Sequence, residues 1–188
     1  MFTSKGSYGY IRGRRSLMLL LTILTLAVTL AIYFTARWYF HTNRNIFTIL
    51  AALCCIGVGK CATDMVMFFR AGCCTKSAME NIELHLGKLQ GLYDLYLTTY
   101  NKDFQISHIV VSGLQVCGFT QTKSCDVRAA GQHIRTMLEH DGYVGYTVQI
   151  YKSLDQYLDC LDALGQTEDP KEHKSSKGVT DLLLSISL

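Results

Sequence analysis

Two apolar runs of membrane length lie in the first 70 residues of the chain. Residues 16–36 (SLMLLLTILTLAVTLAIYFTA) carry no charge over 21 positions. At about 1.5 Å of rise per residue, a helix of this length spans a hydrocarbon core of roughly 30 Å. The run is longer than the core of a signal peptide and no small-residue cleavage pattern follows it, so we expect a retained transmembrane helix. The second run, residues 46–69 (IFTILAALCCIGVGKCATDMVMFF), predicts a second transmembrane helix.

The rest of the chain alternates between helical and β-type patterns. Leucines and tyrosines recur every three or four residues from 77 to 100, after a Ser77/Glu80 capping box, which indicates a helix. β-Branched runs of strand length and further amphipathic segments follow, separated by glycine turns. In chain order these patterns predict strands over 104–112 and 114–122, a helix over 126–140, a strand over 145–151 and a helix over 153–164.

These elements define one small α/β domain over residues 76–164. Residues 165–178 are polar and contain the only proline of the chain, and we interpret them as a flexible linker. The apolar end, residues 179–188, is expected to dock on the domain as an edge strand or a short helix. The predicted fold class is therefore α/β, with a two-helix transmembrane hairpin followed by a small cytoplasmic α/β domain.

Lysines and arginines flank the two apolar runs unevenly. Residues 1–15 form a basic N-terminal segment and two cations follow the second run, whereas the loop 37–45 holds only two cations. Because short segments rich in Lys and Arg stay cytoplasmic, we expect a multi-pass protein of the cell membrane with both termini in the cytoplasm and the loop outside. The cations that carry this orientation are Lys5, Arg12, Arg14, Arg15, Arg70 and Lys76.

The net charge of +3 hides an asymmetry between the two parts of the chain. Residues 1–70 carry a net charge of +7 and residues 71–188 a net charge of −4. The positive charge therefore belongs to the membrane segment and its contact with lipid headgroups. Since the mildly acidic domain lacks the basic face of a phosphate-backbone binder, we do not expect nucleic acid as a partner.

The eight cysteines follow neither a CxxC pattern nor the spacing of a zinc knuckle. A cytoplasmic domain keeps its thiols reduced, so we interpret those of the domain as small buried side chains. We accordingly expect no metal and no cofactor. The adjacent Cys73 and Cys74, just after the second apolar run, are candidates for S-acylation.

Lys60 and Asp64 are opposite charges within the second apolar run, and their spacing of four places them on one helix face. A charged side chain in hydrocarbon is unfavourable, so it is usually paired with an opposite charge or has a functional role. Three interpretations stay open: an ion pair near the inner boundary, a polar tie between helices of an assembly, or part of an ion pathway. From their depth in the hairpin, Thr22 and Thr25 are expected near Lys60, within the hairpin or between chains.

A stripe of small residues on the second apolar run is typical of close helix packing. Its members recur every four residues, and both packing within the hairpin and packing between chains are open as explanations. The stripe consists of Ala51, Cys55, Gly59 and Thr63.

A run in the middle of the domain reads ISHIVV at 106–111, then Gly113, then QTK at 121–123. This run resembles the nuclease-related domain (NERD) of the restriction-endonuclease-like superfamily. In that family a helix precedes a strand of the type IDHIVV, and a second strand ends in ExK. The resemblance covers residues 80–164. It implies a site in which the Asp and Glu bind a divalent metal and the Lys activates water or stabilises charge.

The chain departs from this family pattern at both metal-binding positions. Ser107 stands where the Asp belongs and Gln121 where the Glu belongs, while Lys123 is retained. Hard divalent cations require anionic oxygen ligands, so the loss of both carboxylates predicts the loss of metal-dependent hydrolysis. The resemblance therefore implies a non-catalytic version of the domain.

The leading hypothesis is an integral membrane protein that presents a non-catalytic α/β interaction domain within a homo- or hetero-oligomeric membrane assembly. Its expected partners are membrane lipids and either itself or another membrane protein. Two alternatives stay open. One is a membrane-tethered nuclease-like hydrolase that combines Lys123 with nearby acids such as Asp126 or Asp103. The other is a small transport or channel subunit that uses Lys60 and Asp64.

Overall fold

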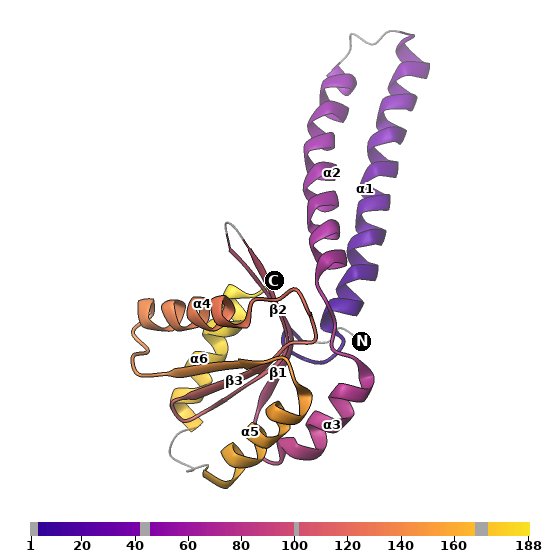
Figure 1. Cartoon of the computed structure of the whole chain (residues 1–188). Helices are drawn as coiled ribbons and strands as arrows, with labels where there is room; N and C mark the ends of the chain where they lie inside the picture. Colours follow the sequence, from indigo (N-terminus) through magenta and orange to yellow (C-terminus); the bar gives the residue numbers. More distant parts are fainter. Residues whose placement is uncertain (1–3, 42–45, 100–101, 168–172) are drawn as a thin grey trace. The chain divides into compact units, whose positions relative to one another are not determined.

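A computed structural model describes residues 4–41, 46–99, 102–167 and 173–188 (Figure 1). The chain divides into two compact units, which we describe separately. One unit is the helical segment 11–71, and the other combines the N-terminal ten residues with residues 72–188. Two long apolar helices followed by an α/β region confirm the α/β class and the order of its parts. The placement of the domain in the cytoplasm stays a prediction.

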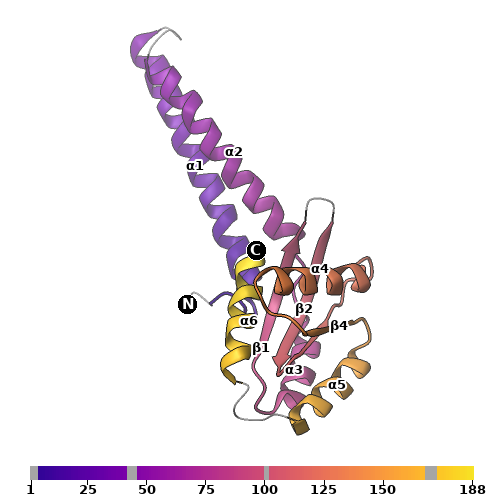
Figure 2. The same ribbon diagram turned by 90° about the vertical axis from the view of Figure 1, so that its left-hand side faces the viewer.

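The helical unit is a hairpin of α1 (Tyr10–Phe40) and α2 (Ile46–Arg70), which lie side by side in both ribbon views (Figures 1 and 2). Both helices are long and apolar enough to cross a membrane. They extend past the predicted 16–36 and 46–69, because the flanking residues still favour helix. α1 therefore includes the first part of the segment 37–45 that we predicted as loop; residues 42–45 of that loop lie outside the described residues.

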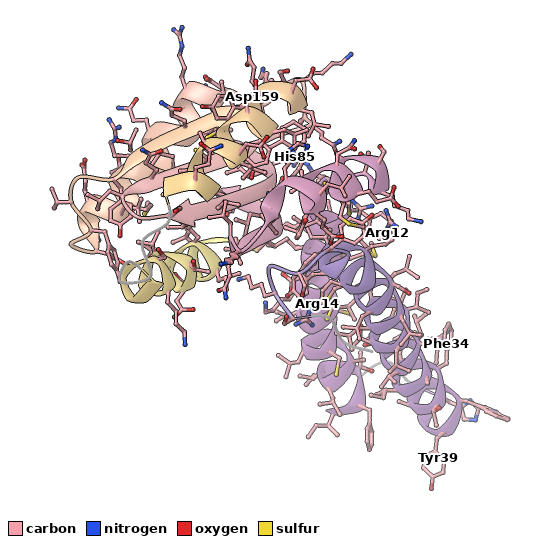
Figure 3. All side chains as sticks on the ribbon, turned by 90° about the horizontal axis from the view of Figure 1, so that it is seen from below. Arg12, Arg14, Phe34, Tyr39, His85 and Asp159 are labelled. Atoms are coloured by element: carbon pink, nitrogen blue, oxygen red, sulfur yellow. The ribbon has the colours of Figure 1, made fainter. Side chains whose placement is uncertain are left out.

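The first turns of α1 are rich in basic side chains, and its last turns are rich in aromatic side chains and also contain Arg37. Arg12 and Arg14 lie toward its first turns, whereas Phe34 and Tyr39 project outward toward the other end (Figure 3). At the basic end, the Arg15 guanidinium donates to the carbonyl oxygens of Phe68, at 2.9 Å, and Ala71. These bonds use carbonyls at the C-terminus of α2, where a cation is stabilised by the helix dipole.

The α/β unit is built on a four-stranded mixed sheet in the order β1-β2-β3-β4. β1, β2 and β3 form an antiparallel meander, and β4 is parallel to β3. A parallel pair requires a crossover, which α4 supplies between β3 and β4. The bounds are β1 Gly91–Thr98, β2 Asp103–Ser112, β3 Gln115–Phe119, α4 Val127–His140 and β4 Thr147–Tyr151.

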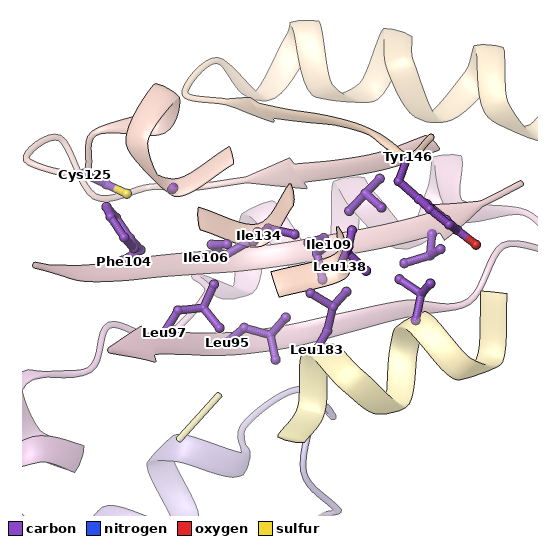
Figure 4. Close-up of a cluster of buried hydrophobic side chains, with 14 residues drawn as sticks. Leu95, Leu97, Phe104, Ile106, Ile109, Cys125, Ile134, Leu138, Tyr146 and Leu183 are labelled. Carbon is purple, nitrogen blue, oxygen red and sulfur yellow. The ribbon is translucent and has the colours of Figure 1, made fainter. Parts of the chain in front are cut away.

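Helices cover both faces of this sheet. α4 and α6 (His173–Ile186) pack on one face, around Ile109, in the cluster drawn in Figure 4. α3 (Lys76–Leu86) and α5 (Leu154–Thr167) pack on the other face, around Val110. Neighbouring residues of β2 thus point into different cores, which explains the unbroken apolar run IVV at 109–111.

The helix predicted over 77–100 is wrong in its second half. α3 ends at Leu86, with Gly87 as its C-cap, and residues 91–98 form strand β1. The capping box is also wrong, because Thr75 and not Ser77 is the N-cap. β1 is buried over five consecutive residues, so its apolar positions do not alternate, and a spacing of three and four fits them as well.

Both ends of the linker predicted over 165–178 are helical. α5 continues past Gly165 to Thr167, and α6 begins at His173; residues 168–172 lie outside the described residues. The expectation that 179–188 docks is confirmed, because α6 packs on the sheet and Ser187 forms a β-bridge with Leu97.

Candidate functional site

The most distinctive local geometry is a kink in β1 at Asp94. Its backbone has a φ of 56°, and the β1–β2 ladder, which pairs Tyr93 with His108 and Leu95 with Ile106, skips it. The buried carboxylate accepts a hydrogen bond of 2.6 Å from the Cys74 N–H and one of 3.3 Å from the Gly9 N–H. One carboxylate thus binds both chain segments that lead into and out of the hairpin.

The strand opposite the kink contributes Ser107, whose hydroxyl accepts from the Gln121 N–H at 3.2 Å. The Gln121 side chain pairs with Thr75 twice, accepting from its N–H at 2.9 Å and donating to its hydroxyl at 2.8 Å. The Thr75 hydroxyl in turn accepts from the Ala78 N–H and caps α3. We call Cys74, Thr75, Asp94, Ser107 and Gln121 the junction cluster.

The junction cluster contains the two positions that the sequence singled out as a degenerate metal site. The structure does bring Ser107 and Gln121 together. However, their polar groups bind the backbone and the N-terminus of α3 and do not converge on an open site. Within residues 4–41, 46–99, 102–167 and 173–188, no group of three His, Cys, Asp or Glu side chains is arranged to hold a metal ion.

The remaining residues of the nuclease-like set do not join this cluster. Lys123 is exposed, and its ammonium makes no hydrogen bond or ion pair to any described residue. Asp126 caps α4 by accepting from the Ala129 N–H, which lowers the pKa of its carboxyl, and it also pairs with Lys102 at 3.4 Å. Asp103 accepts from the hydroxyl of Tyr96, at 2.8 Å.

A buried histidine lies beside the junction cluster on β2. His108 is fully buried, its Nδ1 lies 2.6 Å from the Tyr157 hydroxyl, and its ring packs 4.3 Å from that of Tyr93. Burial lowers the pKa of His108 to about 3, so the ring is neutral. A Cβ on Gly91 would lie 2.1 Å from Nε2, so glycine is required where β1 passes this ring.

Two thiols meet on the face of the sheet that α3 and α5 cover, where His108 also packs. Cys117 of β3 and Cys160 of α5 are free cysteines whose sulfur atoms lie 2.6 Å apart. The pKa of Cys160 is lowered to about 7, above all because the Cys117 thiol donates to it; burial opposes this, and the Tyr151 hydroxyl adds to it. The pKa of Cys117 is raised by the same hydrogen bond and by burial.

In the hairpin, Lys60 pairs with Asp64 at 3.4 Å, and the Lys60 side chain is 79% exposed in the single chain. The hydroxyls of Thr22 and Thr25 donate to carbonyl oxygens of their own helix, and within the chain they do not bond to Lys60. Serine and threonine commonly bond back to the preceding turn in this way. A contact between these threonines and Lys60 of another chain stays a prediction.

The small-residue stripe divides between two environments. Ala51 is buried, whereas Cys55, Gly59 and Thr63 are exposed on the hairpin surface. A Cβ on Gly59 would meet no atom within 4 Å, so packing within the chain does not require a glycine there.

The two lipidation candidates also differ in access. Cys74 is fully buried, and burial raises the pKa of its thiol to about 12. Acylation needs an accessible, nucleophilic sulfur, so Cys74 is unsuited to it. Cys73 is half-buried, and its S-acylation stays a prediction.

Sequence reasoning missed Asp94, Tyr157 and the pairing of Cys117 with Cys160. Asp94 was assigned to a helix, and the contacts Cys117–Cys160 and His108–Tyr157 join residues that lie 43 and 49 positions apart in the chain.

A search against protein-family models, curated proteins and solved structures finds no match to this chain.

Proposed function

We propose that this chain is an integral membrane protein whose hairpin anchors a non-catalytic α/β interaction domain on the cytoplasmic side of the membrane. The observation that carries the proposal is the junction cluster. Ser107 and Gln121, at the positions that the resemblance assigns to metal binding, are neutral and bound to backbone groups. Their contacts hold the segment that follows α2 against the sheet, which is an anchoring role.

The distribution of charge supports the orientation. Most of the basic residues lie at the N-terminus of α1 and the C-terminus of α2. Trp38 and Tyr39 lie at the opposite end, where Arg37 is the one cation of the last turn of α1. Short cationic segments remain cytoplasmic, and aromatic rings favour the membrane interface. This arrangement supports a domain that faces the cytoplasm.

The exposed face of α2 supports assembly between chains. Cys55, Gly59 and Thr63 offer a surface on which a second helix can approach closely, and Lys60 and Asp64 present an ion pair beside it. In hydrocarbon, an ion pair exposed to lipid is unfavourable, and a neighbouring helix removes it from lipid. The partner that this face fits best is a second copy of α2.

The experiment is energy transfer between donor- and acceptor-labelled copies of the full chain in lipid vesicles. We expect efficient transfer in the natural protein and a loss of at least half of it in Gly59→Leu, because the leucine blocks close approach. Gly57→Leu is the matched control, since a Cβ on Gly57 also meets no atom within 4 Å and Gly57 lies on another face. Equal transfer in both variants would contradict the assembly.

A groove between α4 and the edge strand β4 is the surface that we propose for a partner protein. No described segment pairs with the outer edge of β4, whereas Ser187 and Leu188 cover part of the β1 edge. Arg128 and Arg135 line the groove one above the other on α4, and Glu139 lines it one turn beyond Arg135, so the charge of the lining is positive on balance. An unpaired edge beside two cations fits an extended acidic segment, which adds as a further strand.

This surface is tested with a labelled peptide of alternating Glu and Val and the full chain in detergent. We expect the double variant Arg128→Glu, Arg135→Glu to weaken binding at least tenfold. Lys177→Glu, on α6, should leave it unchanged, and salt should weaken it in the natural protein. If the double variant binds the peptide as tightly as the natural protein does, this surface is not the binding site.

The absence of catalysis has its own test. The full chain with Mg²⁺ or Mn²⁺ should cleave single- or double-stranded nucleic acid no faster than its Lys123→Ala variant. Metal-dependent cleavage that disappears in Lys123→Ala would establish the hydrolase alternative instead.

A further inference from the structure

The paired thiols of Cys117 and Cys160 join two elements that the chain separates by 43 residues. Cys117 lies in the interior strand β3 and is 3% exposed, whereas Cys160 lies on α5 and is half-buried. Their sulfur atoms are 2.6 Å apart, which is closer to the bond length of about 2.05 Å in a disulfide than to the separation of unrelated buried thiols. Only a small movement of α5 toward the sheet is needed to join them.

The two thiols differ in the way that a nucleophile and its resolving partner differ. Cys160 is the more accessible of the two, and the hydrogen bond from Cys117 lowers the pKa of its thiol to about 7, which favours the thiolate. The Tyr151 hydroxyl and the Cys117 thiol both stabilise this thiolate. Cys117 stays protonated, because its hydrogen bond to Cys160, its burial and the neighbouring charge all raise its pKa.

The other buried cysteines lack such a partner arrangement. Cys125 lies in the cluster on the opposite face of the sheet, and Cys74 donates to the carbonyl oxygen of Thr75. Burial without a second thiol is the ordinary state of a structural cysteine. The close pairing therefore distinguishes Cys117 and Cys160 from the other domain thiols among the described residues.

We propose that Cys117 and Cys160 form a reversible disulfide when the protein meets a peroxide, and that this bond fastens α5 to β3. In the first step the Cys160 thiolate attacks one oxygen of hydrogen peroxide, the O–O bond breaks, and the products are a sulfenic acid and hydroxide. In the second step the Cys117 sulfur attacks the Cys160 sulfur, the S–O bond breaks, and the leaving hydroxide takes the Cys117 proton as water. Two electrons pass from the two thiols to the peroxide.

The bond is reversed by thiols of low molecular weight. The half-buried Cys160 sulfur is the point at which such a thiol enters, and exchange through a mixed disulfide returns both cysteines to the reduced form. α5 also carries Tyr157, which holds His108. The disulfide thus fixes the helix that packs on the buried histidine of the sheet.

The test uses the reduced full chain in detergent micelles, treated with hydrogen peroxide and then unfolded and labelled with an alkylating reagent. We expect two fewer labelled thiols, a mass loss of about 2 Da before labelling, and a cross-linked peptide that contains Cys117 and Cys160. Dithiothreitol should restore both labels. This measurement on the natural protein needs no variant, so it decides the question even if a substitution prevents folding.

Two variants assign the roles. Cys117→Ser should leave a sulfenic acid on Cys160 that reacts with dimedone, and Cys125→Ser, a control in the other core, should still form the disulfide. At pH 7 Cys160 should react with iodoacetamide about ten times faster than an ordinary half-buried thiol. Retention of both labels after peroxide, or a disulfide that joins other cysteines, would overturn the proposal.

Discussion

At the scale of single residues, Asp94 shows how one side chain can hold two chain segments. Its left-handed backbone is a conformation that Asp and Asn tolerate and most residues do not. Its carboxylate satisfies the N–H groups of Gly9 and Cys74, which lie in the segments before α1 and after α2. The strain of the kink is therefore offset by two charge-assisted hydrogen bonds.

This geometry predicts graded effects of substitution at Asp94. Asp94→Ala should destabilise the α/β unit by about 3–4 kcal/mol, because it removes both bonds and leaves alanine in the left-handed region. Asp94→Asn should lose roughly 1–2 kcal/mol, since the amide oxygen still accepts one bond and Asn tolerates the backbone. Thermal unfolding of the full chain in detergent, followed by near-UV circular dichroism of the tyrosines, measures both. Equal effects of the two variants would contradict the role of the backbone conformation.

The buried His108 predicts a dependence of stability on pH. Its pKa is about 3 in the folded state and about 6.5 when the chain is unfolded. Between these values the unfolded state binds a proton that the folded state excludes, so the contribution of His108 is full above pH 6.5 and is lost as the pH falls toward 3. The expected loss is about 1.4 kcal/mol per pH unit.

The measurement is denaturant unfolding from pH 7 to pH 4 for the natural chain and for His108→Gln. Carboxylates contribute equally to the pH dependence of both proteins. The difference between the two slopes of unfolding free energy against pH therefore reports the contribution of His108. Parallel slopes for the natural chain and His108→Gln would show that the ring is not held neutral.

Sequence patterns predicted single residues well where the reason was local and poorly where it was not. The turn at Gly113 was predicted from neighbouring residues and is present, and the helix predicted to begin at Asp126 does begin there, with Asp126 as its N-cap. The Cys117–Cys160 and His108–Tyr157 contacts depend on how α5 lies against the sheet. No periodicity within one element contains that information.

At the scale of elements, strand β1 explains the main error in the predicted fold. Tyr93, Leu95 and Leu97 are buried, as are their neighbours Asp94 and Tyr96 between them. A strand covered on both faces loses the alternation by which strands are identified. By contrast, the amphipathic α4 and the β-branched β2 were predicted nearly to the residue, because each has one clear period or composition.

The C-terminal helix α6 gives the element-scale prediction. Val179 and Leu183 are fully buried against β1 and β2, so α6 belongs to the core of the domain. Leu183→Ala should destabilise the α/β unit by about 2–5 kcal/mol, through lost burial and the cavity that remains. Urea unfolding measures the change, with Ser185→Ala, on the exposed side of α6, expected within about 0.5 kcal/mol of the natural chain. A small effect of Leu183→Ala would mean that α6 is not anchored.

At the scale of the whole molecule, the single tryptophan reports whether the hairpin lies in a membrane. Trp38 is the only tryptophan of the chain, and it is 81% exposed near the end of α1. In water such a side chain is fully accessible to aqueous quenchers. At a membrane interface its ring lies at the depth of the headgroups, where indole is favoured.

The full chain in lipid vesicles should therefore show Trp38 fluorescence that is quenched more strongly by lipids brominated near the headgroup than by lipids brominated deep in the acyl chain. Iodide should quench it several-fold less in vesicles than after the chain is unfolded in urea without lipid. The same comparison for a variant with Trp38→Phe and Leu24→Trp provides the matched control, because position 24 lies near the middle of α1 and should reverse the order of the two brominated lipids. Strong iodide quenching at both positions would contradict insertion of α1, and with it the anchoring role of the hairpin.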